Sequence, residues 1–273
     1  MSSEPEISTH DDTTESGELK RTLGPIMLWG LGVGYVISGM YFGWNLGLPA
    51  GGTLGLAIAT AFIIILYVTF TFSYTELACA IPKAGGAFDY SNQALGANWG
   101  FLGGMAQNVE FIFAPPAISI AIGAYLNTFN ASAELDLTIP IAISAYLVFT
   151  GINILGVKIA ASLELIITVI AVGELLIFAG ATLPHFEMVN LTRNALPHGI
   201  PGIFAAIPFA IWFFLAIEGV ANVAEETINP QRNVLIGFGS AITTLVILCI
   251  LTFVSAVGVG GWESLVYENG KGG

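Results

Sequence analysis

The chain has 273 residues, of which 55% are hydrophobic and 10% are charged, and its formal net charge at pH 7 is -12. Half of that charge comes from six acidic residues within the first eighteen positions, so the acidity describes one end of the chain. Repeated apolar runs of about 20 residues match a hydrocarbon core of ~30 Å, which excludes a soluble enzyme or a nucleic-acid-binding module and indicates a polytopic helical membrane protein.

The first segment, residues 1–22, is polar and rich in serine, threonine and acidic side chains. Such a composition buries too little apolar surface to fold, so we expect a disordered acidic tail. A secretory signal is excluded because the segment is acidic where a signal is basic, and it has no apolar stretch before Leu23.

The membrane domain is expected to cover residues 23–260, with seven apolar spans. Their expected positions are 24–48, 54–81, 99–126, 139–157, 159–183, 203–224 and 234–257. Between the second and third spans, residues 82–96 are too polar to cross a membrane and predict a loop with a short interfacial helix.

The distribution of basic residues predicts the orientation. Positive charge is retained on the cytoplasmic side of short loops. With a cytoplasmic N-terminus, five basic residues lie inside (Lys20, Arg21, Lys83, Lys158 and Arg232) and two outside (Arg193 and Lys271). We therefore expect a cytoplasmic N-terminus in a multi-pass protein of the cell membrane.

The last segment, residues 261–273, would then lie outside the cell, in a glycine-rich end without finishing structure. Seven spans with an external C-terminus are unusual for a transporter. The sequence is therefore expected to be a fragment that stops inside a longer coding region.

Glycines in the first span allow two interpretations. Gly30, Gly34 and Ser38 lie at four-residue spacing, as do Gly39, Gly43 and Gly47, which lets a neighbouring helix approach closely. Alternatively, residues 34–41 unwind in the membrane and expose backbone groups to a substrate, with Tyr35, Ser38 and Tyr41 as polar groups nearby.

The sixth span carries a carboxylate, Glu218, beside Gly219 and before Asn229-Pro230. A charged side chain at this depth costs roughly 2.5 to 3.5 kcal/mol on insertion scales, so Glu218 should face a bundle interior or a wet cavity. A break near residues 217–219 would leave the carbonyl groups from Trp212 to Leu215 as cation acceptors. The alternative is a continuous helix in which Glu218 bonds to a neighbour.

Three further carboxylates lie within the third and fifth spans. Glu110 precedes Pro115 and Pro116, whose missing amide donors free two carbonyl groups one turn earlier. Either Glu110 forms part of a cation site, or it is protonated and hydrogen-bonded in a kinked helix. We expect structural roles for Glu174 and for Glu164, which lies close to Lys158 in sequence.

Several of these segments resemble a known family. ELACAIPKAGGAFDYSNQALG, at 76–96, resembles the cytoplasmic-loop signature of the amino acid-polyamine-organocation (APC) permeases. The sixth-span pattern of Trp212, Glu218 and Asn229-Pro230 is similar to that family's sixth helix, and Asn153, Gly156 and Lys158 resemble its turn between helices four and five. The first and third spans look most like those of ethanolamine permeases.

The resemblance implies an all-α membrane bundle with a five-plus-five LeuT-type inverted repeat, broken helices one and six, and alternating access. This chain would hold the first repeat and two helices of the second. It also implies a gating position for Trp212. Where amino acid carriers show Gly-Ser-Gly, this chain has Ile37-Ser38-Gly39, whose branched first side chain narrows the approach of a substrate carboxylate. Some members of the family carry a lysine in the fifth helix, and this chain has no lysine at the corresponding position, near Ala171.

We therefore predict a secondary-active permease for a small organic amine, with ethanolamine as the first candidate, in contact with the lipid bilayer. The alternatives are an amino acid permease or exchanger, and a non-transporting receptor or accessory subunit. No enzymatic motif, cofactor or metal site is found, and the coupling ion, proton or sodium, is left open. The predicted substrate site comprises Tyr35, Ser38, Gly39, Tyr41, Glu110, Trp212, Leu215 and Glu218, with Pro115, Pro116 and Gly219 in structural or gating roles.

Overall fold

The computed structural model describes residues 21–130, 135–268 and 271–272, so all but two residues of the expected tail lie outside it. The main helices are α1 (Pro25–Tyr41), α2 (Leu48–Ala80), α4 (Ala97–Asn127), α5 (Thr138–Ile154), α6 (Val157–Thr182), α8 (Gly199–Ala210) and α10 (Pro230–Gly260). Short helices are α3 (Ala87–Leu95), α7 (Met188–Thr192), α9 (Gly219–Asn222) and α11 (Trp262–Val266). Single 3-10 turns form η1 (Trp44–Gly47), η2 (Leu183–His185) and η3 (Ile211–Phe213).

The helices follow the expected spans closely. Four stretches of the described chain are long and apolar enough to cross a membrane: Trp44–Ala80, Ala97–Asn127, Val157–His185 and Pro230–Gly260. Shorter apolar helices occupy the first, fourth and sixth expected positions, and their crossing stays a prediction. The short helix predicted between the second and third spans is confirmed as α3.

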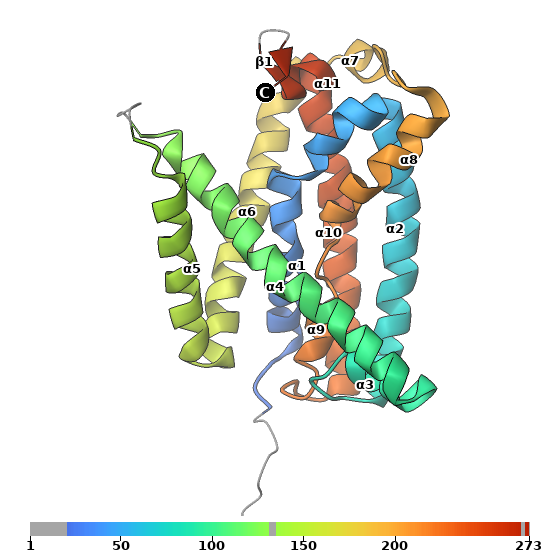
Figure 1. Ribbon diagram of the computed structural model, residues 1–273, viewed down its shortest axis with the longest axis vertical. Coiled ribbons are helices and arrows are strands. Elements are labelled where there is room, and N and C mark those ends of the chain that lie inside the picture. The colour runs from blue at the N-terminus through green and yellow to red at the C-terminus, as the bar shows by residue number, and fades with distance from the viewer. Residues whose placement is uncertain (1–20, 131–134, 269–270, 273) are drawn as a thin grey trace, which may run out of the picture.

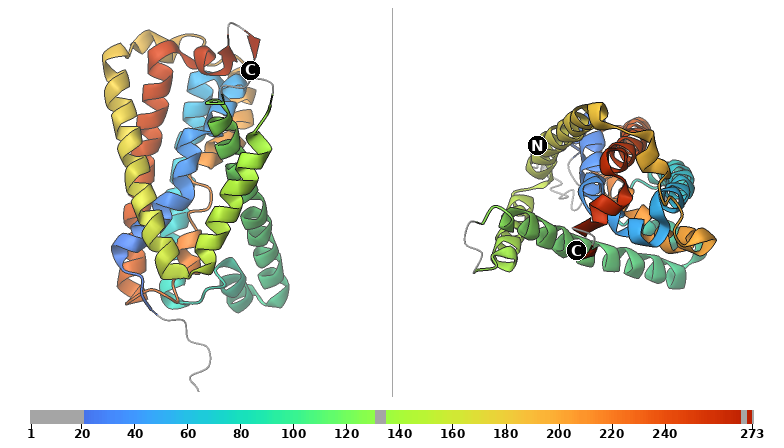
Figure 2. Two further views of the ribbon diagram at one scale, coloured as in Figure 1. Left: turned by 90° about the vertical axis from the view of Figure 1, so that its left-hand side faces the viewer. Right: turned by 90° about the horizontal axis from the view of Figure 1, so that it is seen from above.

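The core lies where α1 packs between α6 and α10, while α2 packs against α8 and α10 (Figures 1 and 2). Glycines make these close approaches possible. A Cβ atom on Gly30 would come 2.7 Å from Leu165 of α6, and one on Gly32 would come 2.8 Å from Ala241 of α10. The packing interpretation is therefore confirmed at Gly30, and Gly32, which the four-residue spacing had not singled out, packs in the same way.

Helices α4 and α5 form a separate arm. In Figure 1, α4 crosses diagonally in front of the bundle, and the view from above in Figure 2 places it along one edge. At its far end α4 packs on α5, where a side chain on Gly123 would overlap the carbonyl group of Thr138. Its other end packs on α3.

The first helix is interrupted, but later than predicted. Helix α1 runs without a break through residues 34–41, and the chain leaves helical geometry at Phe42 and at Gly43, whose φ is 95°. The physical reason is that Gly34 and Gly39 hold neighbouring segments against the helix, whereas only Gly43 adopts a conformation that glycine favours. A further kink falls at Gly52, inside α2, which begins before the second span was expected to begin.

The sixth helix is interrupted where Glu218 predicted it. Helix α8 tightens into η3, residues 214–218 leave the helical pattern, and α9 resumes at Gly219. Ala216 has a φ of 73°, a conformation costly for a residue with a Cβ atom. The alternative of a continuous sixth helix is wrong.

The end of the chain has more structure than expected. After α11, the two-residue strands β1 (Tyr267–Glu268) and β2 (Lys271–Gly272) pair antiparallel. Trp262 donates from Nε1 to the carbonyl oxygen of Asn194 at 3.0 Å, and Asn194 donates from Nδ2 to Glu263 at 2.9 Å. These bonds fix α11 on the loop that follows α7.

Candidate functional site

Two carboxyl groups meet at the interruption of the sixth helix. Glu218 is the residue before α9, and its carboxyl group lies within hydrogen-bonding reach of that of Glu110 on α4. Oε1 of Glu110 is buried, and no described residue gives it a hydrogen bond. The structure thus brings together two residues 108 positions apart that the sequence had singled out separately.

A second polar pair lies one turn away. Gln107 donates from Nε2 to Oδ1 of Asn222 at 3.0 Å. Gln107 and Glu110 are three residues apart on α4, and Glu218 and Asn222 are four apart, so each pair shares a helix face. Sequence analysis missed Gln107 and Asn222, although their spacing from the two glutamates was the signal that could have found them.

Aromatic side chains surround the carboxyl pair. The ring of Tyr35 packs on Gly219, where a Cβ atom would come 2.8 Å from it. Tyr67 and Tyr74 of α2 lie within electrostatic reach of both carboxyl groups, and Tyr67 stacks on Phe214 with ring centroids 5.6 Å apart. The predicted neighbourhood of Tyr35 and Glu218 is therefore present.

Trp212 of η3 packs against the first helix, next to the interruption of that helix. A side chain on Gly39 would overlap the carbonyl oxygen of Trp212, and a Cβ atom on Gly43 would come 3.0 Å from the indole. Phe42 contacts the same indole with ring centroids 6.0 Å apart. Both interruptions therefore meet at Trp212.

The backbone before Glu218 has unused acceptors. Phe214 accepts a bond of 3.4 Å from the amide of Ile217, but the carbonyl oxygens of Trp212 and Leu215 receive none from the described residues. Because the carbonyl oxygen of Trp212 faces Gly39, that of Leu215 is the candidate acceptor of the two. A cation at the break could be coordinated there.

Tyr41 lies away from the carboxyl pair, and the side chain of Ser38 forms no hydrogen bond with the described residues there. Tyr41 is exposed at the end of α1 and donates to the carbonyl oxygen of Ala171 at 2.9 Å and to Glu174 at 3.1 Å. Ser38 accepts the amide of Phe42 through its carbonyl oxygen and is half-buried. Tyr41 therefore ties α1 to α6, and its bond to Glu174 fits the structural role expected there.

The proline pair leaves the third span helical. Helix α4 continues through Pro115 and Pro116, and the hydroxyl of Ser119 donates to the carbonyl oxygen of Pro115 at 3.0 Å. Because neither proline has an amide proton, the carbonyl oxygens of Phe111 and Ile112 lack their helical donors. Phe111 itself reaches Gly219 at the interruption.

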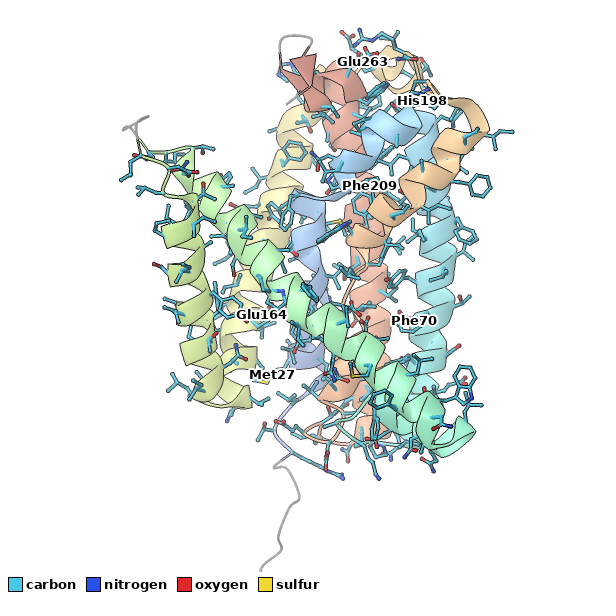
Figure 3. All side chains as sticks on the ribbon, in the orientation of Figure 1. Met27, Phe70, Glu164, His198, Phe209 and Glu263 are labelled. Atoms are coloured by element: carbon cyan, nitrogen blue, oxygen red, sulfur yellow. The ribbon has the colours of Figure 1, made fainter. Side chains whose placement is uncertain are left out.

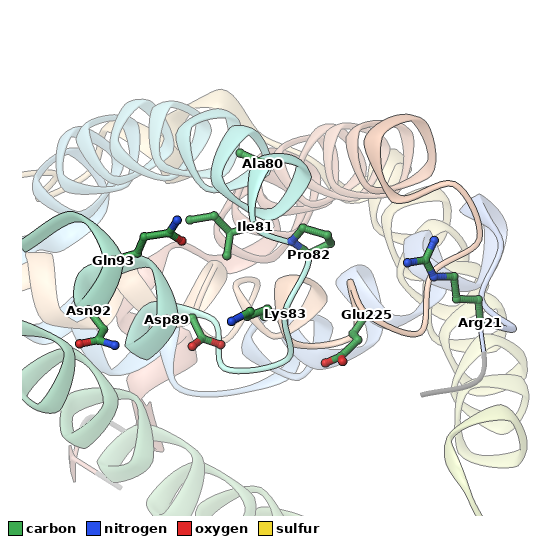
Figure 4. A pocket seen from close by; sticks show the side chains of 9 residues that line it. All are labelled: Arg21, Ala80, Ile81, Pro82, Lys83, Asp89, Asn92, Gln93 and Glu225. Atoms are coloured by element: carbon green, nitrogen blue, oxygen red, sulfur yellow. The ribbon is translucent and has the colours of Figure 1, made fainter. Parts of the chain in front are cut away.

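Two cavities lie between this region and one end of the bundle. One of about 360 Å³, beside Gln107 and Asn222, separates α3 from α4 and α9. The other, of about 610 Å³, is lined by charged and amide side chains: Arg21, Lys83, Asp89, Asn92, Gln93 and Glu225 (Figure 4). Arg21 and Lys83 thus share one end of the molecule, as the charge distribution predicted.

The opposite end holds the single ion pair of the described residues, between Arg193 and Glu263 at 3.9 Å. Its members are 56% and 40% exposed, so it contributes little stability. At the end with the large cavity, burial and the neighbouring Glu225 raise the pKa of Glu226.

Comparisons with known proteins agree with this architecture. A family model described as "Amino acid permease" matches residues 23–273. An uncharacterized transporter of Rhizobium meliloti is 30% identical over 93% of this chain and 58% of its own length. Cationic amino acid transporter 1 of Arabidopsis thaliana is 26% identical over 86% of this chain and 42% of its own length. A methylthioribose transporter of Bacillus subtilis is 25% identical over 95% and 59%.

A bundle of apolar helices, four of them long enough to cross a membrane, defines a multi-pass membrane protein. The chain belongs to the amino acid permease family, within the APC superfamily. It spans about half the length of the curated relatives that it matches.

Proposed function

We propose that this protein is a secondary-active transporter for a small organic amine, with ethanolamine as the first candidate. The observation that carries the proposal is the pair of carboxyl groups, Glu110 and Glu218, at the break of the sixth helix. Two carboxylates so close repel each other, and an ammonium group between them would remove that repulsion.

The surroundings favour an amine over an anion. Oε1 of Glu110 has no donor among the described residues, and the carbonyl oxygen of Leu215 is a further free acceptor. An ammonium group supplies three donors, which matches this set. The approach to the first helix is closed by Trp212 against Gly39, which supports a substrate that has no carboxylate to bind there.

An amino acid permease or exchanger is the second candidate. It is favoured by the family match and by relatives named as amino acid transporters, including cationic amino acid transporters. A cationic amino acid would also bring an ammonium group to the carboxyl pair. Its carboxylate would then need hydrogen-bond donors, such as the amide groups of Gln107 and Asn222 or the tyrosine hydroxyls of this region.

The proposed mechanism is alternating access in a LeuT-type inverted repeat with a cytoplasmic N-terminus. Two observations support it: the first and sixth helices are both interrupted, and their interruptions meet at Trp212. The clustering of Arg21 and Lys83 at one end supports the orientation. Seven membrane crossings in this chain remain part of the proposal.

Uptake by the complete gene product in a transport-deficient host tests the substrate. Labelled ethanolamine should accumulate faster than in cells carrying an empty vector, and unlabelled ethanolamine should compete where glutamate does not. Faster accumulation of arginine or leucine than of ethanolamine would support the amino acid permease. Failure of all of these substrates to accumulate, at confirmed membrane expression, would support the non-transporting alternative.

A matched pair of variants tests the site. Glu110→Gln should weaken ethanolamine uptake by at least about tenfold, since the loss of one charge-assisted contact costs roughly 1.5 to 3 kcal/mol. Glu174→Gln should leave uptake within about twofold, because Glu174 is exposed and bonds to Tyr41. Equal uptake by the two variants at matched expression would remove Glu110 from the substrate site.

A further inference from the structure

A fourth carboxylate lies in the bundle, away from the substrate pair. Glu164 of α6 was expected to be structural and close to Lys158, but the structure turns it toward α1 at Gly34. A side chain on Gly34 would overlap Oε1 of Glu164 and would come 2.6 Å from the hydroxyl oxygen of Thr168. Figure 3 shows Glu164 closer to Met27, in the lower part of the bundle, than to Glu263 at the top.

No positive charge balances Glu164. The ion pair between Arg193 and Glu263 is the one such contact within the described ranges, and Lys158, on the same helix, is exposed. No described residue donates a hydrogen bond to the Glu164 carboxyl group; the nearby hydroxyl of Thr168 donates instead to the carbonyl oxygen of Gly30 at 3.0 Å. Because no described residue donates to it, this carboxyl group must be stabilised by water, by a proton or by a bound cation.

Space for such a cation is present. A cavity of about 160 Å³ lies beside Glu164, between α1, α5, α6 and α9, with Tyr35, Asn153 and Val223 on its other walls. The lining side chains from α5 and α9 are uncharged. Two titratable groups face this region. The hydroxyl of Tyr35 interacts electrostatically with Glu164, and Glu226 interacts electrostatically with the same hydroxyl. Both would be neutral or negative, so neither could neutralise Glu164.

We propose that Glu164 is the coupling site, at which one monovalent cation, a proton or Na⁺, binds during transport. This inference rests on the proposed transport function but concerns a different site. Carboxylate, phenol and amide oxygens are ligands that suit a hard cation, and a carboxylate alone suffices for a proton.

A physical connection joins this site to the substrate pair. The ring of Tyr35 lies on the cavity wall and also packs on Gly219, the residue after Glu218. With Glu164 neutral, α1 and α6 can keep the close contact seen at Gly34. With Glu164 ionised, its carboxylate requires water or a cation, which disfavours that contact. Cation binding therefore biases the packing of α1. By linkage, the cation changes the affinity for substrate by the same factor by which substrate changes the affinity for the cation.

The transport test uses the complete protein and three variants. Net uptake of ethanolamine by the wild type is measured at pH 8 and pH 5.5, and with Na⁺ or with N-methylglucamine in its place. One of these two changes should alter uptake by at least about fivefold, which is the low end of the range for coupling between two sites. Glu164→Gln should abolish that dependence while exchange of labelled for unlabelled ethanolamine continues. Glu164→Asp should keep the dependence, and Glu174→Gln, on the same helix, should leave it unchanged. The arm that responds tells a proton from Na⁺.

A second measurement needs no substrate. In purified protein, lower pH or added Na⁺ should raise the melting temperature of the wild type, because neutralising a buried carboxylate favours the folded state. Glu164→Gln should respond less than the wild type by roughly 2 to 4 °C, the shift expected for a ΔΔG of about 1 kcal/mol in a protein of this size, because the Glu110 and Glu218 pair and Glu226 still titrate in both proteins. The inference is overturned if Glu164→Gln responds as the wild type does, or if the wild type responds to neither cation.

The two proposals fail in different ways. If the wild type accumulates no ethanolamine but its melting temperature responds more strongly to the cation than that of Glu164→Gln, the amine proposal fails and the cation site stands. If ethanolamine accumulates and Glu164→Gln keeps the full cation dependence, the amine proposal stands and the coupling site lies elsewhere.

Discussion

The two helix interruptions solve the same geometric problem with different chemistry. In the first, Gly43 takes the positive φ, and the indole of Trp44 donates to the carbonyl oxygen of Met40 at 3.1 Å, so a freed acceptor is satisfied within one turn. In the second, Ala216 takes the positive φ, and the carbonyl oxygen of Leu215 stays without a donor among the described residues.

This difference indicates which interruption serves function. A break made at a glycine costs little backbone strain. A break with backbone strain, a free acceptor and a carboxyl pair is costly, and such costs concentrate at functional sites. We therefore assign a structural role to the first interruption, which packs against Trp212 next to the second one, and the functional role to the second.

The largest expected effect comes from removing that contact. Gly39→Ala would place a methyl group on the carbonyl oxygen of Trp212, and because the obstacle is backbone, it cannot rotate away. We expect a loss of more than about 3 kcal/mol of stability, seen as low folded yield by size-exclusion chromatography.

Gly239→Ala in α10 is the matched control for Gly39→Ala. A Cβ atom there would meet nothing within 4 Å, so its yield should match the wild type. Similar yields for the two alanine variants would mean that α1 does not depend on close contact with Trp212.

An intermediate effect is expected at the first interruption. Gly43→Ala forces a side chain into a φ of 95° and brings it within 3.0 Å of the Trp212 indole. This should cost about 1 to 3 kcal/mol, measured as a lower melting temperature of the purified protein. An unchanged melting temperature would show that the first interruption is not confined to a glycine conformation.

The smallest effect, of opposite sign, is expected at the second interruption. Ala216→Gly relieves the strain of a φ of 73°, about 1 to 2 kcal/mol, while the freer unfolded chain takes back about 0.4 to 1 kcal/mol. The melting temperature should therefore rise slightly. A lower melting temperature would mean that the strain is absorbed by contacts of the Ala216 methyl group, and the contrast between the two interruptions would then be lost.

Much of the helical framework could be predicted because it depends on local patterns. Apolar runs located the helices, and the polarity of residues 82–96 located α3. A carboxylate next to glycine, Glu218-Gly219, located the second interruption. A charged side chain is costly in lipid whichever neighbours the helix has, so this signal did not depend on the tertiary packing.

What could not be predicted depends on which faces meet. Nothing in sequence spacing joins Glu110 to Glu218, since α4 reaches α9 only through the fold. The same holds for Tyr41, which bonds to Glu174 on α6, and for Glu164, which faces Gly34 while Lys158 stays exposed. The density of first-span glycines indicated unwinding and packing equally, and the structure uses Gly30, Gly32, Gly34 and Gly39 for packing.

The diagonal course of α4 gives it unequal arms. Its polar contacts with α9 fall at Gln107 and Glu110, so at 1.5 Å per residue about 15 Å of helix extends from Gln107 to Ala97 and about 26 Å from Glu110 to Asn127. A rigid rod pivoting at that point would move its α5 end nearly twice as far as its α3 end. A tilt of a few degrees at the carboxyl pair would thus become a displacement of more than an ångström where α4 packs on α5.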